Sequence, residues 1–267
     1  MENKKLAVVT GASNGIGKEL AKLFAKDGYS LVIAGRDEER LAVTASELQA
    51  LGAQQIHSFL GDLTDRSQVE ALFQKIKSVG LPIDAVAINA GRGLGGRFAT
   101  ETSIEEELEI INLNITSTVL LAKLVVPDMV ARGQGRILFT GSISGTTPVP
   151  FEAVYGGSKA FVNSFSHALR IELQGTGVTT TVLMPDATET DFFHHAHMED
   201  TKVGSGPKQD VEVVAQEGYD ALMSGRESVF GGDLMAKVRG RVMNSVLPDK
   251  LKERMAGHRS EPGGAKL

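Results

Sequence analysis

Short apolar runs alternate with helix-length amphipathic stretches along most of the chain. The runs that we expect to be strands are Leu6–Thr10, Ser30–Ala34, Gln55–Leu60, Ala85–Asn89, Arg136–Thr140, Val178–Met184 and Ser228–Phe230. The stretches that we expect to be helices are Gly15–Asp27, Glu38–Leu51, Ser67–Ser78, Ile104–Arg132, Val154–Gln174 and Val211–Ser224. Strands that are apolar throughout and alternate with helices form parallel sheets covered on both faces. The pattern therefore predicts an α/β fold, a doubly wound parallel sheet of about seven strands with helices on both faces.

Length, composition and charge limit the classes to which the chain can belong. Its 267 residues are 42% hydrophobic and 23% charged, which is ordinary for a soluble globular protein. No repeat or linker divides the sequence, so we expect a single domain over residues 1–267. The net charge of −5 gives no reason to expect nucleic-acid binding, and no apolar run approaches the roughly 18 residues of a membrane helix. Cysteine is absent, which excludes disulfides and thiolate catalysis and fits a cytoplasmic location.

A glycine-rich turn joins the first expected strand to the first expected helix. It reads Thr10-Gly11-Ala12-Ser13-Asn14-Gly15-Ile16-Gly17. Glycines let the backbone approach a pyrophosphate closely, and the helix N-terminus offers free N–H groups and a positive dipole end to that anion. The spacing differs from the standard dinucleotide fingerprint, so on its own the motif could be a turn without a ligand. Its place between the first strand and the first helix favours a dinucleotide cofactor.

The end of the second expected strand bears on the choice between NAD and NADP. It reads Ala34-Gly35-Arg36-Asp37. An acid near this position would bond the ribose 2′-hydroxyl of NAD, which is a role open to Asp37. An arginine would instead meet the 2′-phosphate of NADP. We favour Arg36 and NADP(H), with use of NAD left open, because Gly35 leaves room for a phosphate. Asp37 would then begin the next helix as a cap or first-turn acid.

Tyr155 and Lys159 lie four residues apart, and Ser142 precedes the tyrosine by thirteen residues. Residues four apart on a helix share a face, so the ammonium should lie beside the phenol. An ammonium favours the phenolate and should lower the pKa of Tyr155 from its usual value of about 10. A serine hydroxyl at the same point can hold a carbonyl oxygen. The three residues together predict a proton-transfer centre.

In their order and spacing, the motifs of the chain resemble those of the short-chain dehydrogenase/reductase family in its single-domain form. The resemblance covers nearly the whole chain up to about residue 230. It rests on the glycine-rich turn, Asp62-Leu63, Asn89-Ala90-Gly91, Asn114, Ser142, Tyr155, Lys159, Pro185 and Thr190. It implies a Rossmann-type fold and an oxidoreductase that moves a hydride between a nicotinamide cofactor and a carbonyl or secondary alcohol.

The resemblance also implies the roles of four catalytic residues. Tyr155 should give a proton to the carbonyl oxygen during reduction or remove it during oxidation. Lys159 should bond the nicotinamide ribose and lower the pKa of Tyr155. Ser142 should donate a hydrogen bond to the substrate oxygen. Asn114 should hold a water that links Lys159 to solvent.

A cofactor-binding set follows from the same resemblance. Asp62 and Leu63 should contact the adenine, and Asn89, Ala90 and Gly91 should line the adenine-ribose side. The hydroxyl of Thr190 should bond the nicotinamide carboxamide. The full set is Gly11, Ser13, Asn14, Gly15, Ile16, Gly17, Arg36, Asp62, Leu63, Asn89, Ala90, Gly91, Tyr155, Lys159, Pro185 and Thr190.

Three positions leave alternatives open. Ser144 competes with Ser142, although Ser142 has the expected spacing to Gly145 and to the tyrosine. Asn112 competes with Asn114, which the distance to the next strand favours. Asp186 stands where the family usually has a glycine after the proline, which puts the conformation of that loop in doubt.

Two segments have no motif of their own. Residues 186–210 should form a substrate-binding loop. Its three histidines, His194, His195 and His197, we interpret as polar loop residues and not as metal ligands, since no acidic pattern completes a site. Residues 236–260 carry seven Lys or Arg and two acids, a local charge of +5. We favour a helical extension with a solvated face there, and the alternative is a docking surface for an acidic carrier or an anionic membrane.

The function predicted from the sequence is hydride transfer between NADP(H) and a carbonyl or secondary alcohol, with tyrosine as the acid or base. One alternative is a 3-oxoacyl-thioester reductase of lipid synthesis. Another is a non-catalytic NADP-binding regulator, which would have no need for an intact Ser142, Tyr155, Lys159 and Asn114. The resemblance also implies a homodimer or homotetramer that pairs the expected helices Ile104–Arg132 and Val154–Gln174.

Overall fold

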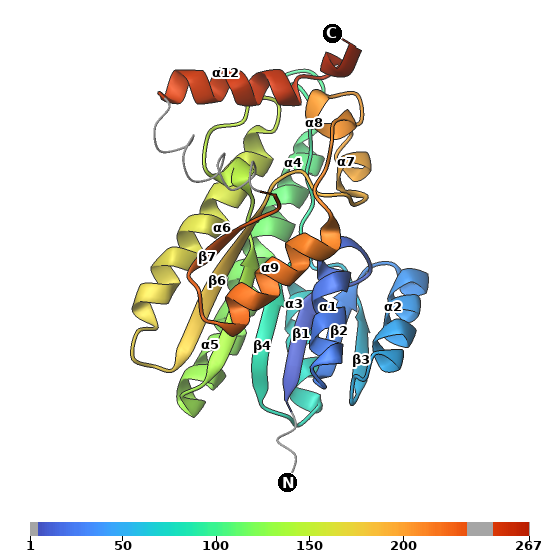
Figure 1. Cartoon of the computed structure of the whole chain (residues 1–267), viewed down its shortest axis with the longest axis vertical. Coiled ribbons are helices and arrows are strands. Elements are labelled where there is room, and N and C mark those ends of the chain that lie inside the picture. Colours follow the sequence, from blue (N-terminus) through green and yellow to red (C-terminus); the bar gives the residue numbers. More distant parts are fainter. Residues whose placement is uncertain (1–4, 234–247, 267) are drawn as a thin grey trace.

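A seven-stranded sheet forms the centre of the molecule in the computed structural model, which describes residues 5–233 and 248–266 (Figure 1). The strand order is β3-β2-β1-β4-β5-β6-β7, and each neighbouring pair is parallel. The strands are β1 (Leu6–Thr10), β2 (Ser30–Gly35), β3 (Ile56–Leu60), β4 (Ile83–Ile88), β5 (Gly135–Thr140), β6 (Val178–Pro185) and β7 (Ser228–Gly231). The predicted fold class is confirmed, and the predicted strand bounds differ from these by two residues at most.

Helices cover both faces of the sheet because both faces of its strands are apolar. In β1, Leu6 and Val8 belong to one core, and Ala7 and Val9 belong to the other. Burying each large aliphatic side chain in this way stabilises the fold by about 1.5–3 kcal/mol. One face is covered by α1 (Gly15–Lys26), α2 (Glu38–Ala50) and α9 (Val211–Met223), and the other by α3 (Arg66–Ser78), α5 (Ser117–Arg132) and α6 (Ala153–Glu172).

The helix predicted over Ile104–Arg132 contains a local change of winding. It consists of α4 (Ile104–Ile111), a π-helical turn over Asn112–Thr116 and α5. Ser103 begins it, with its side chain bonded to the backbone of Glu106 in a capping box. Insertions of this kind widen one turn and often lie at functional sites, and this one carries a predicted site residue.

The same helix corrects the expectation that no stretch of the chain is long and apolar enough to cross a membrane. Within the described residues, Ile104–Arg132 passes that test, with a mean hydropathy of 1.6 over an 18-residue window. A core helix passes it equally well, and 44% of the window is buried inside the protein. Its α5 part packs on β4 and α3, and its α4 part packs on α6. The helix therefore has a structural use within this fold.

Three further helices gather at the end of the molecule opposite the N-terminus (Figure 1). They are α7 (Phe192–His195), α8 (Lys202–Ser205) and α12 (Asp249–Ser260). The first two lie in the predicted substrate-binding loop, which is therefore partly regular. Of the basic extension predicted over 236–260, residues 249–260 form α12, and residues 236–247 lie outside the described part of the chain.

Candidate active site

The carboxyl ends of the strands open into a cleft of about 1140 Å³. After β3 the chain returns to the centre of the sheet and continues with β4 on the other side of β1. Such a reversal of strand order leaves a crevice where ligands bind in open α/β sheets. The glycine-rich turn, the ends of β2, β4 and β5, the first turns of α6, the segment after β6 and the last turns of α12 line this cleft.

The glycine-rich turn is shaped for a close approach by a ligand. Gly11 and Gly15 have φ angles of +68° and +57°, a region that side chains rarely adopt. A Cβ on Gly17 would lie 2.2 Å from the carbonyl oxygen of Gly11. Asn89 fastens the turn, since its Nδ2 donates to the carbonyl oxygen of Thr10 over 3.1 Å. The turn leads directly into α1, whose first N–H groups can receive a phosphate.

The end of β2 presents both residues between which the sequence left a choice. The half-exposed Arg36 guanidinium pairs with Asp62, with 3.4 Å between Nη1 and Oδ2. Asp37 caps α2, because its Oδ1 accepts a hydrogen bond of 3.0 Å from the backbone N–H of Arg40. The interpretation of Asp37 as a helix cap is therefore confirmed. Arg36 lines the cleft, whereas the predicted adenine-contacting acid, Asp62, lies beside the lining residues Gly61 and Leu63 and reaches the cleft through its contact with Arg36.

The expectation that Gly35 leaves open space for a phosphate is wrong. The Ser13 hydroxyl occupies that space, 2.0 Å from where a Cβ on Gly35 would stand. That hydroxyl is buried and has no hydrogen-bond partner among the described residues, although it lines the cleft. A buried polar atom without a partner is costly. Ser13 and Arg36 therefore fit a ribose or phosphate group, which is the part of a dinucleotide expected there.

The remaining predicted cofactor residues lie around the same cleft. Thr190 packs against the glycine-rich turn, with its Cγ2 3.1 Å from the position of a Cβ on Gly15. Asn89 ties β4 to β1 and β5, because its Oδ1 accepts from the Thr140 hydroxyl over 3.0 Å. The cleft is also lined by Asn14, Ile16, Leu63, Ala90, Gly91 and Pro185.

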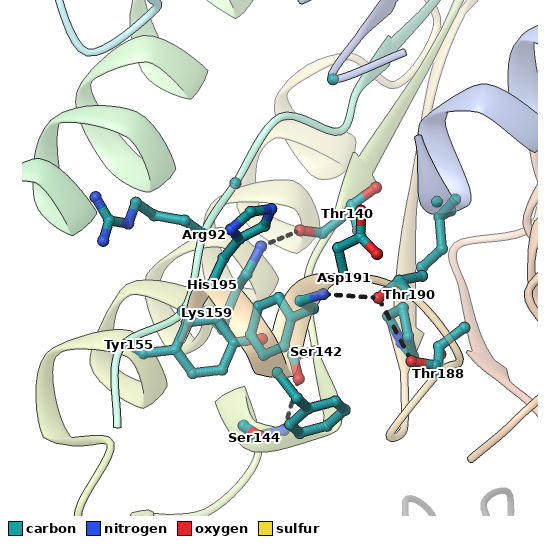
Figure 2. A pocket seen from close by; sticks show the side chains of 18 of the residues that line it. Arg92, Thr140, Ser142, Ser144, Tyr155, Lys159, Thr188, Thr190, Asp191 and His195 are labelled. Carbon is teal, nitrogen blue, oxygen red and sulfur yellow. Dashed lines mark hydrogen bonds between the residues drawn. The ribbon is translucent and has the colours of Figure 1, made fainter. Parts of the chain in front are cut away.

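Tyr155, Ser142 and Lys159 converge on one point of the cleft (Figure 2). Tyr155 is 6% exposed, and its ring packs against that of Phe192 with 5.3 Å between centroids. The hydroxyl of Ser142 lies near enough to the phenol to act on its pKa. The Nζ of Lys159 lies 5.9 Å from the centre of the Tyr155 ring and donates to the Thr140 carbonyl oxygen over 2.8 Å. The predicted proximity of the three side chains is confirmed.

The expected lowering of the pKa of Tyr155 by Lys159 is wrong for this structure. Burial raises the pKa of the phenol above its ordinary value, and the charge of Glu152 adds to the rise, whereas the hydrogen bond with Ser142 opposes it. Burial also lowers the pKa of Lys159 to about 8. Desolvation disfavours the charged form of both groups, and neither group contributes to the shift of the other. The phenol is therefore protonated at neutral pH, which suits a proton donor.

Asn114 lies in the π-helical turn and is 1% exposed. Its Nδ2 donates to the Ser158 hydroxyl over 2.9 Å, and its Oδ1 accepts from the backbone N–H of Arg92 over 3.1 Å. Asn114 and Lys159 approach each other at Gly91, where a Cβ would lie 3.1 Å from Oδ1 and 3.2 Å from Nζ. Asn112 is exposed, so of the two candidates only Asn114 faces the cleft residues.

Both serine candidates, Ser142 and Ser144, line the cleft. Ser142 is buried, and its Oγ accepts a hydrogen bond of 3.0 Å from the backbone N–H of Ser144, which begins a short turn over Ile143–Gly145. The spacing from Ser142 to Gly145 has a steric cause. A Cβ on Gly145 would lie 2.5 Å from the backbone carbonyl carbon of Lys159, so this turn packs directly on α6.

Sequence reasoning noted Asp186 but missed Glu152 and the contacts that both residues make with α12. Glu152 is buried and accepts a hydrogen bond from Ser260 of α12. Asp186 pairs with Arg259, with 3.5 Å between Oδ1 and Nη2. The favoured interpretation of the C-terminal helix as an ordinary solvated face is therefore wrong at its last turn, which lines the cleft. The sequence feature that could have revealed this part of the site is Glu152, an acidic residue three positions before Tyr155.

Comparisons with known proteins agree with this geometry. A family model described as short chain dehydrogenase matches residues 5–200. Sulfoacetaldehyde reductase 2 of Chromohalobacter salexigens is 35% identical over 188 residues, which cover 70% of this chain and 74% of that protein. The NADP-dependent 3-hydroxy acid dehydrogenase of Salmonella typhi is 33% identical over 180 residues, or 67% of this chain and 71% of that protein.

A solved structure extends the similarity to almost the whole chain. The short-chain dehydrogenase of Sphingobium yanoikuyae in complex with NADPH has a TM-score of 0.79 and 27% sequence identity. The alignment covers 94% of this chain and 95% of that one. The matched sequence, the parallel sheet and the convergent tyrosine, serine and lysine lead to one conclusion. The chain belongs to the short-chain dehydrogenase/reductase family and is an oxidoreductase that acts on CH–OH groups with NAD or NADP.

Proposed function

We propose that the protein reduces a ketone or aldehyde to an alcohol with NADPH, or catalyses the reverse reaction. The observation that carries the proposal is the convergence of Tyr155, Ser142 and Lys159 on one point of the cleft. The opposite end of the same cleft has a turn and a helix N-terminus suited to a pyrophosphate. A dinucleotide lying between these ends would bring its nicotinamide to the tyrosine.

The chemical step divides between the cofactor and the chain. When bound, the nicotinamide supplies or accepts the hydride. The chain handles the proton, because the buried phenol of Tyr155 can donate to the oxygen of the reacting carbonyl. The Ser142 hydroxyl can hold the same oxygen, and Lys159, 5.9 Å from the centre of the Tyr155 ring, lies where it can bond the cofactor ribose. In a partly desolvated cleft these interactions are stronger than in water.

NADP is the cofactor that we favour. Arg36 offers a guanidinium at the end of β2, and Ser13 offers a hydroxyl without a partner among the described residues. The ion pair between Arg36 and Asp62 is exposed and long, so a phosphate could displace Asp62 from the guanidinium at little cost in free energy. Asp37 is already engaged as a helix cap. An NAD-type contact to the ribose hydroxyl would compete with that capping bond.

A substrate panel with NADPH and NADH tests the proposal. The panel contains small ketones, anionic carbonyl compounds such as sulfoacetaldehyde, 3-oxo acids and 3-oxoacyl thioesters. Oxidation of NADPH with at least one carbonyl, at a higher kcat/KM than with NADH, is the expected result. Tight NADPH binding without turnover of any carbonyl would instead support a cofactor-binding regulator. Turnover of the thioesters alone would favour a role in lipid synthesis.

Self-association is a further proposal, based on exposed apolar residues of α6. Phe161 is 39% exposed and stacks on Phe165, and Ile171 is 62% exposed. Such residues can be covered when α6 pairs with the same helix of a second copy. We therefore expect a homodimer or homotetramer, which light scattering can establish. A monomer at micromolar concentration would argue against this pairing.

A further inference from the structure

Glu152 is a buried carboxyl in the cleft that hydride and proton transfer do not use. It is 6% exposed, lines the cleft and immediately precedes α6. Tyr155 lies in the first turn of α6, three residues after Glu152, and lines the same cleft. The charge of Glu152 also acts on the phenol of Tyr155. A substrate whose carbonyl oxygen meets Tyr155 would therefore have its neighbouring carbon atoms near this carboxyl.

The hydrogen bonding of Glu152 leaves part of the carboxyl available. Its Oε1 accepts a hydrogen bond from the Ser260 hydroxyl, which is its one hydrogen-bond partner among the described residues. A carboxylate has two oxygens and can accept about four hydrogen bonds. Buried carboxyl groups are normally satisfied, because a missing partner costs free energy. The cleft side of Glu152 thus has the capacity to accept from a ligand.

The backbone before Glu152 holds this carboxyl in place at some cost. Phe151 has a φ angle of +68°, a conformation that is unfavourable for a bulky residue. Its carbonyl oxygen accepts from the backbone N–H of Gly96 over 2.8 Å, and the Arg97 guanidinium lies 5.6 Å from the centre of its ring. Gly257 of α12 packs on Pro150, since a Cβ there would lie 3.2 Å from the Pro150 Cγ. Contacts from separate elements therefore fix the orientation of the segment.

The charges around Glu152 favour a ligand group that donates hydrogen bonds. Asp186 is a second buried carboxyl that lines the cleft. Arg259 contributes the nearby positive charge and pairs with Asp186. The partner of Glu152 is a neutral hydroxyl. The two carboxyl groups offer hydrogen-bond acceptors to a ligand, while Lys159 and Lys252 also line the cleft and Arg259 acts on Glu152.

We propose that Glu152 is a specificity-determining residue that accepts a hydrogen bond from a hydroxyl or ammonium group on the carbon beside the reacting carbonyl. Ser260 positions the carboxyl for this contact. Both Ser260 and Arg259 lie outside residues 5–200, where the family model matches. The selection of substrate in this chain therefore depends on α12. The proposal rests on carbonyl reduction as the function of the cleft.

The test compares four matched ketones as substrates: acetone, hydroxyacetone, aminoacetone and acetoacetate. The measured quantity is the kcat/KM of each substituted ketone divided by that of acetone, with NADPH. Burial raises the pKa of Glu152 to about 7, so the ratios are measured above that pH, where the carboxylate predominates. Glu152→Ala should then lower the ratio for the substrate with the favoured donor by about 10- to 100-fold, the usual effect of losing a hydrogen bond to a charged group. Glu152→Gln should keep part of the preference, since its amide oxygen still accepts. Ser260→Ala should cause a smaller loss in the same direction.

Glu70→Ala is the matched control, because it removes an exposed carboxylate of α3 that pairs with Arg66. It should leave all ratios unchanged. A preference for hydroxyacetone and one for aminoacetone would each support the proposal and would identify the donor. Unchanged ratios in Glu152→Ala and Glu152→Gln would overturn it, as would acetoacetate as the best wild-type substrate. Absence of turnover with these ketones and with every carbonyl compound of the substrate panel would refute the proposed carbonyl reduction itself, a separate outcome.

Discussion

The Nζ of Lys159 donates a hydrogen bond of 2.8 Å to the main-chain carbonyl oxygen of Thr140. This contact joins α6 to the carboxyl end of β5, and Ser142 follows two residues later. The lysine thereby fixes the relative position of two elements that carry reactive groups. It also leaves an ammonium group buried without a carboxylate partner among the described residues. A charge in such a place must affect the stability of the folded protein.

The stability of the wild-type protein should increase with pH through a defined window. The pKa of Lys159 falls from 10.5 to about 8 on folding, because burial disfavours the ammonium. Between these values the unfolded chain binds more protons than the folded one, so the free energy of unfolding rises with pH. The increase should be at most roughly 3 kcal/mol. Urea denaturation at several pH values measures it, and Lys159→Met should abolish it. The same slope in both proteins would contradict the assignment.

Replacement of Tyr155 by phenylalanine should remove the proton donor and keep the cofactor site. We expect turnover to fall by roughly 10²–10⁴-fold, the usual range for a general acid, with little change in the Kd of NADPH. Stopped-flow kinetics and fluorescence titration measure the two effects. Tyr219→Phe is the control, because its hydroxyl donates to Asp27 over 2.6 Å on the side of α1 and α9. Near-normal turnover in Tyr155→Phe would show that another group transfers the proton.

Arg36→Ala should distinguish the two cofactors. The guanidinium can pair with a 2′-phosphate, which NADPH has and NADH lacks, so the Kd of NADPH should rise by about 10-fold or more. The Kd of NADH should change little. Arg66→Ala, which removes an exposed arginine from α3, serves as the control for a lost surface charge. Equal weakening of both cofactors would return Asp37 to the leading position.

Two glycine substitutions should have opposite consequences. Gly145→Ala places a Cβ 2.5 Å from the backbone of Lys159, so it should separate the serine-bearing turn from α6 and lower both stability and turnover. Overpacking of this kind costs about 1–3 kcal/mol. Gly157→Ala lies on the exposed side of α6, where nothing is within 4 Å, and should stabilise the helix by up to about 1 kcal/mol. Thermal unfolding compares the two variants. Equal shifts in Tm would argue against the close packing described here.

Local sequence patterns were sufficient for the sheet and for the meeting of its reactive residues. The apolar strands occupy one sheet because each buries both faces, and a four-residue helical spacing joins Tyr155 to Lys159 without reference to the rest of the fold. The cap at Asp37 follows from the same local chemistry. These features depend on neighbours in the chain, which a sequence displays directly.

Other features depend on contacts between distant residues, and these could not be foreseen. Glu152 and Ser260 lie 108 positions apart in the chain. The raised pKa of Tyr155 reflects burial, which the tyrosine–lysine spacing does not reveal. The π-helical turn at Asn112–Thr116 cannot be recognised from its composition, because Asn, Leu, Ile and Thr also occur in ordinary α-helices. Ser13 fills the space beside Gly35 only because β2 adjoins β1.

Because α12 packs on the loop before α6, the residues for proton transfer and those proposed to select the substrate come from different parts of the chain. The groups that move the proton lie within the part of the chain that its relatives share, whereas Ser260 and Arg259 lie close to its C-terminal end. Exchange of residues 248–266 for those of another family member would therefore leave the reaction intact and alter which compounds enter it.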